Sequence, residues 1–332
     1  MRDLTLASVR ADAPVFASGG CVLASSVAAV SVIAMRLDGQ SLLPPDIVPV
    51  GRVIPLDGRG ETFFRHHTGG APDAPPVLLL HGWTATADLQ FCTAYEQLGN
   101  GYPFLAIDQR GHGRGIRDVR PFTIEDAADD AAALIVALGL PPVVALGYSM
   151  GGPVALTLAR RHPHLVAALV LQATSMTFHR DRFDRLRWGL GALLETVLRS
   201  RGATKLAEFG LARAMKTNPE LRPWGAWLAG ELRRSEPISL AEAGRSLRAF
   251  DGSFAADLRV PAGVLVTTKD QLVPPAHQRA LAAALGAEIV ELAGDHYCTW
   301  LLGAEYSQAT RTLVDRVVGR LATPAAVGAR SA

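Results

Sequence analysis

A serine stands between two glycines in the pentapeptide Gly147-Tyr148-Ser149-Met150-Gly151. This pentapeptide directly follows the apolar run Val143–Leu146, which is typical of a buried strand, and directly precedes a stretch typical of a helix. A strand, a sharp turn and a helix in this order predict a nucleophile elbow, in which a strained turn presents the serine hydroxyl. Such a turn needs small residues two positions away on either side, and Gly147 and Gly151 provide them. We therefore expect Ser149 to act as a nucleophile.

A serine hydroxyl is a weak nucleophile at neutral pH, so it needs a general base that is itself oriented by a carboxylate. His296 follows the predicted strand Ile289–Leu292. Asp270 follows the predicted strand Gly263–Val266. Functional side chains of open parallel sheets gather at the carboxyl ends of the strands, where both residues are expected. Asp295 is a rival for the carboxylate, but neighbouring side chains tend to diverge, so we expect Asp270 to orient His296.

Acyl transfer also needs backbone N–H groups aimed at the oxygen that becomes negative. We expect Met150 N–H to be one donor, because Met150 follows the nucleophile at the start of a helix. The other is expected from His81-Gly82-Trp83-Thr84, which follows the apolar run Val77–Leu80. Trp83 N–H is the natural donor in that loop. We expect His81 to hold the loop through its ring nitrogens rather than to transfer a proton.

Apolar runs of strand length alternate with helix-like stretches, which predicts a parallel sheet covered by helices on both faces. The predicted parallel strands are Val77–Leu80, Phe104–Ile107, Val143–Leu146, Leu165–Leu171, Gly263–Val266 and Ile289–Leu292. An antiparallel pair, Arg52–Leu56 and Glu61–His66, is expected to open the sheet. The predicted helices are Thr123–Leu138 with Thr123 as its N-cap, Gly152–Arg161 and a long closing helix over Thr299–Leu321.

The alternation is interrupted over residues 176–254, here named the cap segment, which has many helix formers and no clear buried-strand run. We expect it to form a helical cap over the sheet, inserted between two parts of the core at residues 46–175 and 255–322. Ordinary surface helices are the alternative. Residues 323–332 are small and are expected to form a flexible tail.

The cap segment is expected to choose the substrate, because it would cover the nucleophile. The candidate pocket residues are its tryptophans: Trp188, Trp224 and Trp227. If they face the cleft, the pocket is apolar. Packing of the cap helices on the core is their alternative role. The cap segment also carries more Arg and Lys than Asp and Glu, and we expect most of these side chains to be solvated.

Residues 1–45 form a leader with two interpretations. From Ala13 to Met35 there is no charged residue, and about 20 apolar residues suffice to cross a bilayer, although serines and glycines dilute this segment. Met1–Asp12 balances two arginines against two aspartates, unlike the basic start of a signal peptide. Residues 13–35 are therefore open to two interpretations. They form a helix that anchors in a membrane or lies at its interface, or they form a poorly ordered leader or a helix packed on the core. The protein is otherwise expected in the cytoplasm.

The composition disfavours several classes of function. The formal net charge is only +2 and no basic run occurs, so a nucleic-acid partner is not expected. The three cysteines have no CxxC spacing, and no metal-ligand spacing, dinucleotide glycine pattern or phosphate loop competes with the serine motif. We therefore expect neither a metal nor a cofactor. The sequence does not determine the oligomeric state.

These motifs resemble those of the α/β-hydrolase fold-1 family over roughly residues 50–322. The motifs that carry the resemblance are His81-Gly82-Trp83, Asp108-Gln109-Arg110-Gly111-His112-Gly113, Gly147–Gly151, Asp270 and Gly294-Asp295-His296. The resemblance implies an α/β fold with a mostly parallel, doubly wound sheet and a helical cap insertion. It implies nucleophile, acid and base roles for Ser149, Asp270 and His296. It also implies oxyanion donors at Trp83 and Met150, and loop-holding roles for Asp108 and His112.

The expected function is that of a serine hydrolase that cleaves carboxylic esters of small to medium apolar substrates through an acyl-enzyme. A lactonase, a C–C bond hydrolase and a perhydrolase would use the same triad and remain alternatives. A non-catalytic ligand-binding protein of this fold is an alternative of another class. The serine at position 149 disfavours haloalkane dehalogenases and epoxide hydrolases of this fold, which use an aspartate there.

Overall fold

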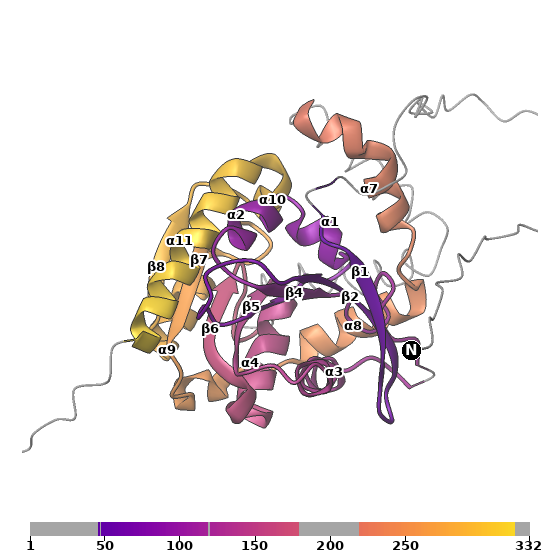
Figure 1. The fold of residues 1–332 in the computed structure, drawn as a ribbon. Coiled ribbons are helices and arrows are strands. Elements are labelled where there is room, and N and C mark those ends of the chain that lie inside the picture. Colours follow the sequence, from indigo (N-terminus) through magenta and orange to yellow (C-terminus); the bar gives the residue numbers. More distant parts are fainter. Residues whose placement is uncertain (1–45, 47, 119, 179–218, 323–332) are drawn as a thin grey trace, which may run out of the picture. The chain divides into compact units, whose positions relative to one another are not determined.

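The computed structural model of the chain describes residues 46, 48–118, 120–178 and 219–322. Eight strands in these ranges form one sheet in the order β1-β2-β4-β3-β5-β6-β7-β8 (Figure 1). The strands are β1 (Gly51–Leu56), β2 (Gly60–His67), β3 (Val77–Leu80), β4 (Phe104–Ile107), β5 (Val143–Tyr148), β6 (Val166–Gln172), β7 (Ala262–Thr267) and β8 (Glu288–Leu292). β1 pairs antiparallel with β2, and β2 with β4, whereas every other pair is parallel. All the predicted strands are therefore confirmed.

Helices cover both faces of this sheet, as the alternating pattern predicts. They are α1 (Ala87–Phe91), α2 (Tyr95–Gly99), α3 (Ile124–Ala137), α4 (Gly151–Arg161), α7 (Gly225–Leu232), α8 (Pro237–Ala249), α9 (Pro275–Leu285), α10 (Cys298–Leu301) and α11 (Gly303–Ala322). Short 3-10 helices lie at Pro163–Leu165, Pro219–Trp224 and Ser253–Asp257. In Figure 1, α3 and α4 lie on one side of the sheet, and α2 and α11 lie on the other.

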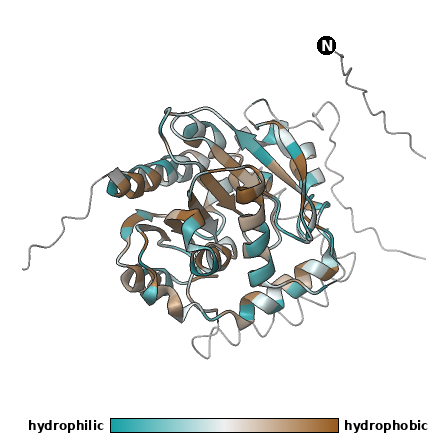
Figure 2. Cartoon of the chain, turned by 60° about the horizontal axis from the view of Figure 1, so that its bottom comes forward, coloured by the Kyte–Doolittle hydropathy of each residue, from teal (hydrophilic) through white to brown (hydrophobic). Residues whose placement is uncertain are grey.

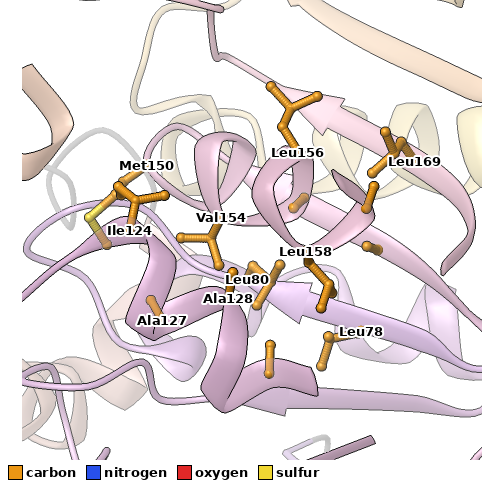
Figure 3. Close-up of a cluster of buried hydrophobic side chains, with 14 of the residues drawn as sticks. Leu78, Leu80, Ile124, Ala127, Ala128, Met150, Val154, Leu156, Leu158 and Leu169 are labelled. Atoms are coloured by element: carbon orange, nitrogen blue, oxygen red, sulfur yellow. The ribbon is translucent and has the colours of Figure 1, made fainter. Parts of the chain in front are cut away.

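The core lies between the parallel strands and the helices. β3, β4 and β5 are buried along their whole length, because a strand in the middle of a doubly covered sheet meets apolar side chains on both faces. Figure 3 shows Leu78 and Leu80 of β3 facing Val154 and Leu158 of α4. Figure 2 shows the same division by hydropathy, with hydrophobic strands inside and polar residues on the outer helix faces.

Thr123 caps α3 as its sequence predicts. Its backbone is extended, and its hydroxyl accepts a hydrogen bond from Asp126 N–H at 2.9 Å. This bond satisfies one of the amides that the first turn of a helix leaves unpaired.

The predicted closing helix over Thr299–Leu321 is wrong in one respect, since it is two helices that meet at Leu302. The Leu302 backbone is not helical, with φ of −133° and ψ of 48°. Thr93 bonds to the chain at this break, since its hydroxyl donates to the Thr299 carbonyl at 2.9 Å. In a continuous helix, that carbonyl would accept from the N–H of Gly303. The break lets α10 close the loop after β8 while α11 packs along the sheet.

Of the cap segment, the structure describes residues 176–178 and 219–254, and the second of these ranges is mostly helical and contains α7 and α8. α7 contacts α1, and α8 contacts α3, so both helices of this part pack on the core. Trp188 lies outside the described residues, as do the predicted leader and tail. The boundaries of the cap therefore stay a prediction. No helix in the described ranges is long and apolar enough to cross a membrane, and residues 13–35 are not among them.

A buried ionic cluster fastens α7 to the core. Glu231 of α7 is 1% exposed and accepts from the Arg114 guanidinium at 2.8 Å. Arg114 also pairs with Asp88 and Asp108, each at 3.0 Å, and Arg65 pairs with Asp88 at 2.6 Å. Burial raises the pKa of Glu231, and the negative charges of Asp88 and Asp108 raise it further, whereas the Arg114 charge lowers it. Arg114 therefore joins three buried carboxylates that would otherwise repel one another.

Replacing this arginine should destabilise the protein strongly. Arg114→Ala leaves buried carboxylates without their shared partner, so the free energy of unfolding should fall by about 3–5 kcal/mol. Denaturation in guanidinium chloride measures this change. The control is Arg279→Ala, which removes an ion pair to Glu291 between two roughly half-exposed side chains. That change should cost less than about 1 kcal/mol. Equal losses in the two variants would contradict the importance of the buried cluster.

Candidate active site

Ser149 occupies a strained turn between β5 and α4. Its φ is +51°, in the left-handed region that residues other than glycine seldom adopt. A Cβ at Gly147 would overlap the carbonyl of Gly151, and a Cβ at Gly151 would overlap the carbonyl of Leu80. Only glycine therefore fits at either position. The predicted elbow is present, with the serine side chain at the carboxyl end of β5.

His296 lies between the other two residues of the predicted triad. Its Nε2 is 3.0 Å from Ser149 Oγ, and its Nδ1 is 2.8 Å from Asp270 Oδ2. A carboxylate can only accept, so Nδ1 carries the proton and Nε2 is free to accept the serine proton. Ser149 and His296 are more than 100 positions apart in the chain, and the structure brings both side chains together with Asp270. Each follows a parallel strand at the same edge of the sheet.

The Asp270 carboxylate is buried and held by several donors. Its Oδ1 accepts from Leu272 N–H and Val273 N–H, each at 2.9 Å. Its Oδ2 accepts from the Thr267 hydroxyl at 2.9 Å, besides the bond to the imidazole. These bonds fix the carboxylate and stabilise its negative charge. Asp295, the rival carboxylate, instead accepts from Tyr297 N–H at 2.8 Å in its own loop.

Gln278 of α9 supports this acid, and the sequence analysis missed it. The side chain is fully buried. Its Nε2 donates to the Thr267 hydroxyl at 2.8 Å and to the Val273 carbonyl at 2.7 Å, and its Oε1 accepts from Thr267 N–H at 2.9 Å. The amide therefore ties the end of β7 to the loop that carries Asp270. In the sequence, this residue is a glutamine among the alanines and leucines of a helical stretch, and it belongs to no recognisable motif.

The predicted oxyanion loop lies against the nucleophile. Met150 begins the turn into α4 directly after Ser149 and is fully buried. A Cβ at Gly82 would stand 3.3 Å from Ser149 Cβ, so this loop approaches the serine as closely as a glycine allows. The Trp83 indole N–H donates to the Leu240 carbonyl of α8 at 2.6 Å. The same residue that is expected to supply a backbone donor therefore also contacts the cap segment.

Two buried histidines, His81 of this loop and His112 of the loop after β4, hold the main chain here. Gln109 N–H donates to His81 Nε2 at 2.9 Å, so the His81 proton is on Nδ1, which donates to the Gly82 carbonyl at 2.8 Å. His112 Nδ1 donates to the Arg110 carbonyl at 2.9 Å. Burial lowers the pKa of His81 to about 4 and that of His112 to about 3. Both rings are thus neutral and hold loops in place.

The tryptophans that were expected to line a pocket are only partly described. Trp188 lies outside the described residues. Trp224 is half-buried, and Trp227 is 3% exposed. In the ranges that the structure covers, no ring contact or hydrogen bond joins either of them to the triad. The burial of Trp227 favours packing of α7 on the core, so a pocket role for these residues stays a prediction.

A groove of about 570 Å³ opens beside His296, and the sequence did not predict it. Its apolar lining includes Leu272, Tyr297, Leu301 and Leu302. Leu272 is 40% exposed and Tyr297 is 61% exposed. The groove therefore offers a surface on which an apolar group could lie next to the imidazole. Within the described ranges, no group of His, Cys, Asp and Glu side chains is arranged to hold a metal ion.

Several known proteins are similar to this chain. A family model described as alpha/beta hydrolase fold matches residues 75–300. The pimeloyl-[acyl-carrier protein] methyl ester esterase of Neisseria meningitidis serogroup B (strain H44/76) is 34% identical over 208 residues, 61% of this chain and 78% of that protein. A thermophilic esterase from Thermogutta terrifontis superposes with a TM-score of 0.64 and 26% identity, over 81% of this chain and 99% of that one. An enol-lactonase from Burkholderia xenovorans LB400 superposes with a TM-score of 0.66 and 24% identity, over 81% of this chain and 100% of that one.

The buried histidines should make the fold sensitive to acid. Their pKa values in the folded protein, about 4 and about 3, lie below the value of 6.5 for an ordinary histidine. The unfolded chain therefore takes up protons first, and the stability that is present above pH 6.5 is lost as the pH falls toward 4. With two such groups, the free energy of unfolding changes by at most about 2.7 kcal/mol per pH unit.

His112→Gln should remove about half of this slope, or about 1.4 kcal/mol per pH unit. Urea denaturation at several pH values between 4.5 and 7 measures it. His164→Gln is the control, because this histidine is exposed, and it should leave the slope as in the wild type. If His112→Gln also left the slope unchanged, the neutral buried ring would not be the cause.

Proposed function

The chain belongs to the alpha/beta hydrolase family, and on this premise we propose that it is a serine hydrolase that cleaves carboxylic esters through an acyl-enzyme. The observation that carries the proposal is the continuous series of hydrogen bonds from Ser149 through His296 to Asp270. This series begins on a strained turn whose serine faces the start of a helix. The relatedness to a methyl ester esterase supports ester hydrolysis over the other reactions that this fold performs.

The proposed reaction uses groups of the chain and water. Ser149 Oγ attacks the acyl carbon while His296 Nε2 takes its proton. The carbonyl oxygen becomes negative and is stabilised by the backbone N–H groups of Met150 and Trp83. His296 then returns the proton to the leaving alcohol, and water cleaves the acyl-enzyme with the same imidazole as base. Asp270 holds the Nδ1 proton and stabilises the imidazolium that forms.

We further propose that the substrates are small to medium esters with an apolar part. Because His296 protonates the leaving oxygen, the alcohol must leave on the side of the imidazole. The groove beside His296, with the exposed Leu272 and Tyr297, supports an apolar group there. Trp188, Trp224 and Trp227 are retained as candidates for the acyl pocket. Lactone, C–C bond and peroxide chemistry use the same triad. A panel of esters, lactones and diketones, assayed side by side with and without hydrogen peroxide, separates them.

A second candidate is an ester whose acyl chain carries a charged or carrier-linked far end. The relative from Neisseria meningitidis is named for a substrate that is held on an acyl-carrier protein. The cap segment has 14 Arg and Lys against 9 Asp and Glu, which favours substrates that bear negative charge. Hydrolysis rates of a methyl ester with a free carboxylate at its far end, and of the corresponding dimethyl ester, test this candidate. A clear preference for the charged ester supports it.

Removing the nucleophile tests the proposal directly. Ser149→Ala should lower kcat by about a millionfold, because the other residues of the unit cannot act without it. The thermal midpoint should stay close to that of the wild type. Hydrolysis of a p-nitrophenyl ester and covalent labelling by a fluorophosphonate probe are the measurements, with exposed Ser253→Ala as the control that should label normally. Turnover above a few per cent of the wild type, or labelling of Ser149→Ala, would sink the assignment.

A pair of isosteric changes tests the acid. Asp270→Asn should lower kcat by about 10⁴-fold, since an amide can donate to Nδ1 and so favours the wrong tautomer of His296. Asp295→Asn should change kcat little, because that carboxylate only accepts a bond in its own loop. Steady-state kinetics on the same ester measures both. The opposite outcome would assign the acid to Asp295.

A further inference from the structure

We propose that Tyr148 is a positioning residue, whose hydroxyl holds the loop carrying His296 at hydrogen-bond distance from Ser149. The inference rests on the proposed function, since it concerns the same triad. Tyr148 is the last residue of β5 and directly precedes the nucleophile. One residue would therefore connect the backbone of the nucleophile to the backbone of the base.

Tyr148 contacts His296 directly. The Tyr148 side chain is 1% exposed, and its hydroxyl is 3.0 Å from the His296 carbonyl oxygen. A carbonyl can only accept, so the tyrosine donates. Its ring also meets the imidazole nearly edge-on, with centroids 5.7 Å apart and an angle of 64° between the planes. The tyrosine thus touches both the main chain and the ring of the base.

The His296 carbonyl needs this donor because of where it lies in the chain. It is two residues before α10, in the loop that follows β8. A longer helix would direct Trp300 N–H at this carbonyl, but that N–H donates to Tyr297 O at 3.0 Å instead. A partly buried carbonyl without a donor is costly, so the tyrosine bond stabilises this loop geometry.

Tyr148 is itself held from the opposite side. Its ring meets Tyr306 of α11 nearly edge-on, with centroids 6.0 Å apart. The Tyr306 hydroxyl donates to Gln172 Oε1 at 2.7 Å, which ties α11 to β6. Burial, together with the nearby Cys298 thiol, raises the pKa of Tyr148 well above its ordinary value. The hydroxyl therefore stays protonated at neutral pH and remains a donor.

The consequence concerns rate rather than affinity. His296 lies on a loop, whereas Ser149 is fixed by its strained turn, so the distance between them depends on how firmly the loop is held. A displacement of about 1 Å between catalytic groups can cost about 100-fold in rate. A residue that only fills space would affect stability and leave the chemical step unchanged.

Tyr148→Phe tests the proposal, because it removes the hydroxyl and keeps the ring. We expect kcat to fall about 10- to 100-fold, and KM to stay within about twofold, since the substrate contacts are kept. The rate of fluorophosphonate labelling should fall in parallel with kcat. Titration of active sites with the probe corrects kcat for any unfolded protein.

The matched control is Tyr306→Phe, which removes another buried tyrosine hydroxyl. That hydroxyl donates to Gln172 rather than to the loop of His296, although the Tyr306 ring contacts the Tyr148 ring. Tyr306→Phe should lower the thermal midpoint about as much as Tyr148→Phe does, and it should leave kcat and the rate of labelling unchanged. Two outcomes overturn the proposal: wild-type kinetics for Tyr148→Phe, or an equal loss of kcat in both variants. Ser149→Ala is measured beside them. Residual turnover in that variant would refute the proposed function itself, whatever the tyrosine variants do.

Discussion

The left-handed backbone of Ser149 is the constraint on which the rest of the site depends. A non-glycine residue in this conformation costs of order 1–3 kcal/mol, so the surrounding structure must hold it. Ser149 N–H donates to the Gln172 carbonyl at 2.9 Å, and the Thr174 hydroxyl donates to the Ser149 carbonyl at 2.7 Å. Gly151 lets the turn pack against the Leu80 carbonyl of the neighbouring strand. Three adjacent strands therefore share the stabilisation of one strained residue.

Buried polar side chains hold the two loops that must meet this serine. Gln278 reaches from α9 to the end of β7 and holds the loop of Asp270. Tyr148 reaches from β5 to the loop of His296. In each case a side chain on a regular element satisfies backbone groups that the loop cannot satisfy itself. Polar atoms are used because a hydrogen bond fixes direction, whereas apolar packing is less directional.

The cap segment is joined to the core next to the same site. Glu231 of α7 enters the buried cluster with Arg114, and the Trp83 indole donates to the Leu240 carbonyl of α8. Trp83 also lies in the loop that is proposed to bind the negative oxygen, directly after Gly82. A movement of α8 would therefore also displace the main chain of that loop. This proximity links the part of the chain that is proposed to choose the substrate with the part that is proposed to stabilise the transition state.

The sequence by itself determined the strands, the elbow at Ser149 and the order of the three candidate residues, because these depend on local patterns. Apolar runs and small residues around a serine are visible over a few positions, and parallel strands necessarily bring their carboxyl ends to one edge. Only the tertiary structure decided where the closing helix breaks. The hydroxyl that donates to the Thr299 carbonyl at this break belongs to Thr93, about 200 positions away. The support from Gln278 and Tyr148 was likewise invisible, because a buried polar side chain is defined by partners that only the folded chain supplies.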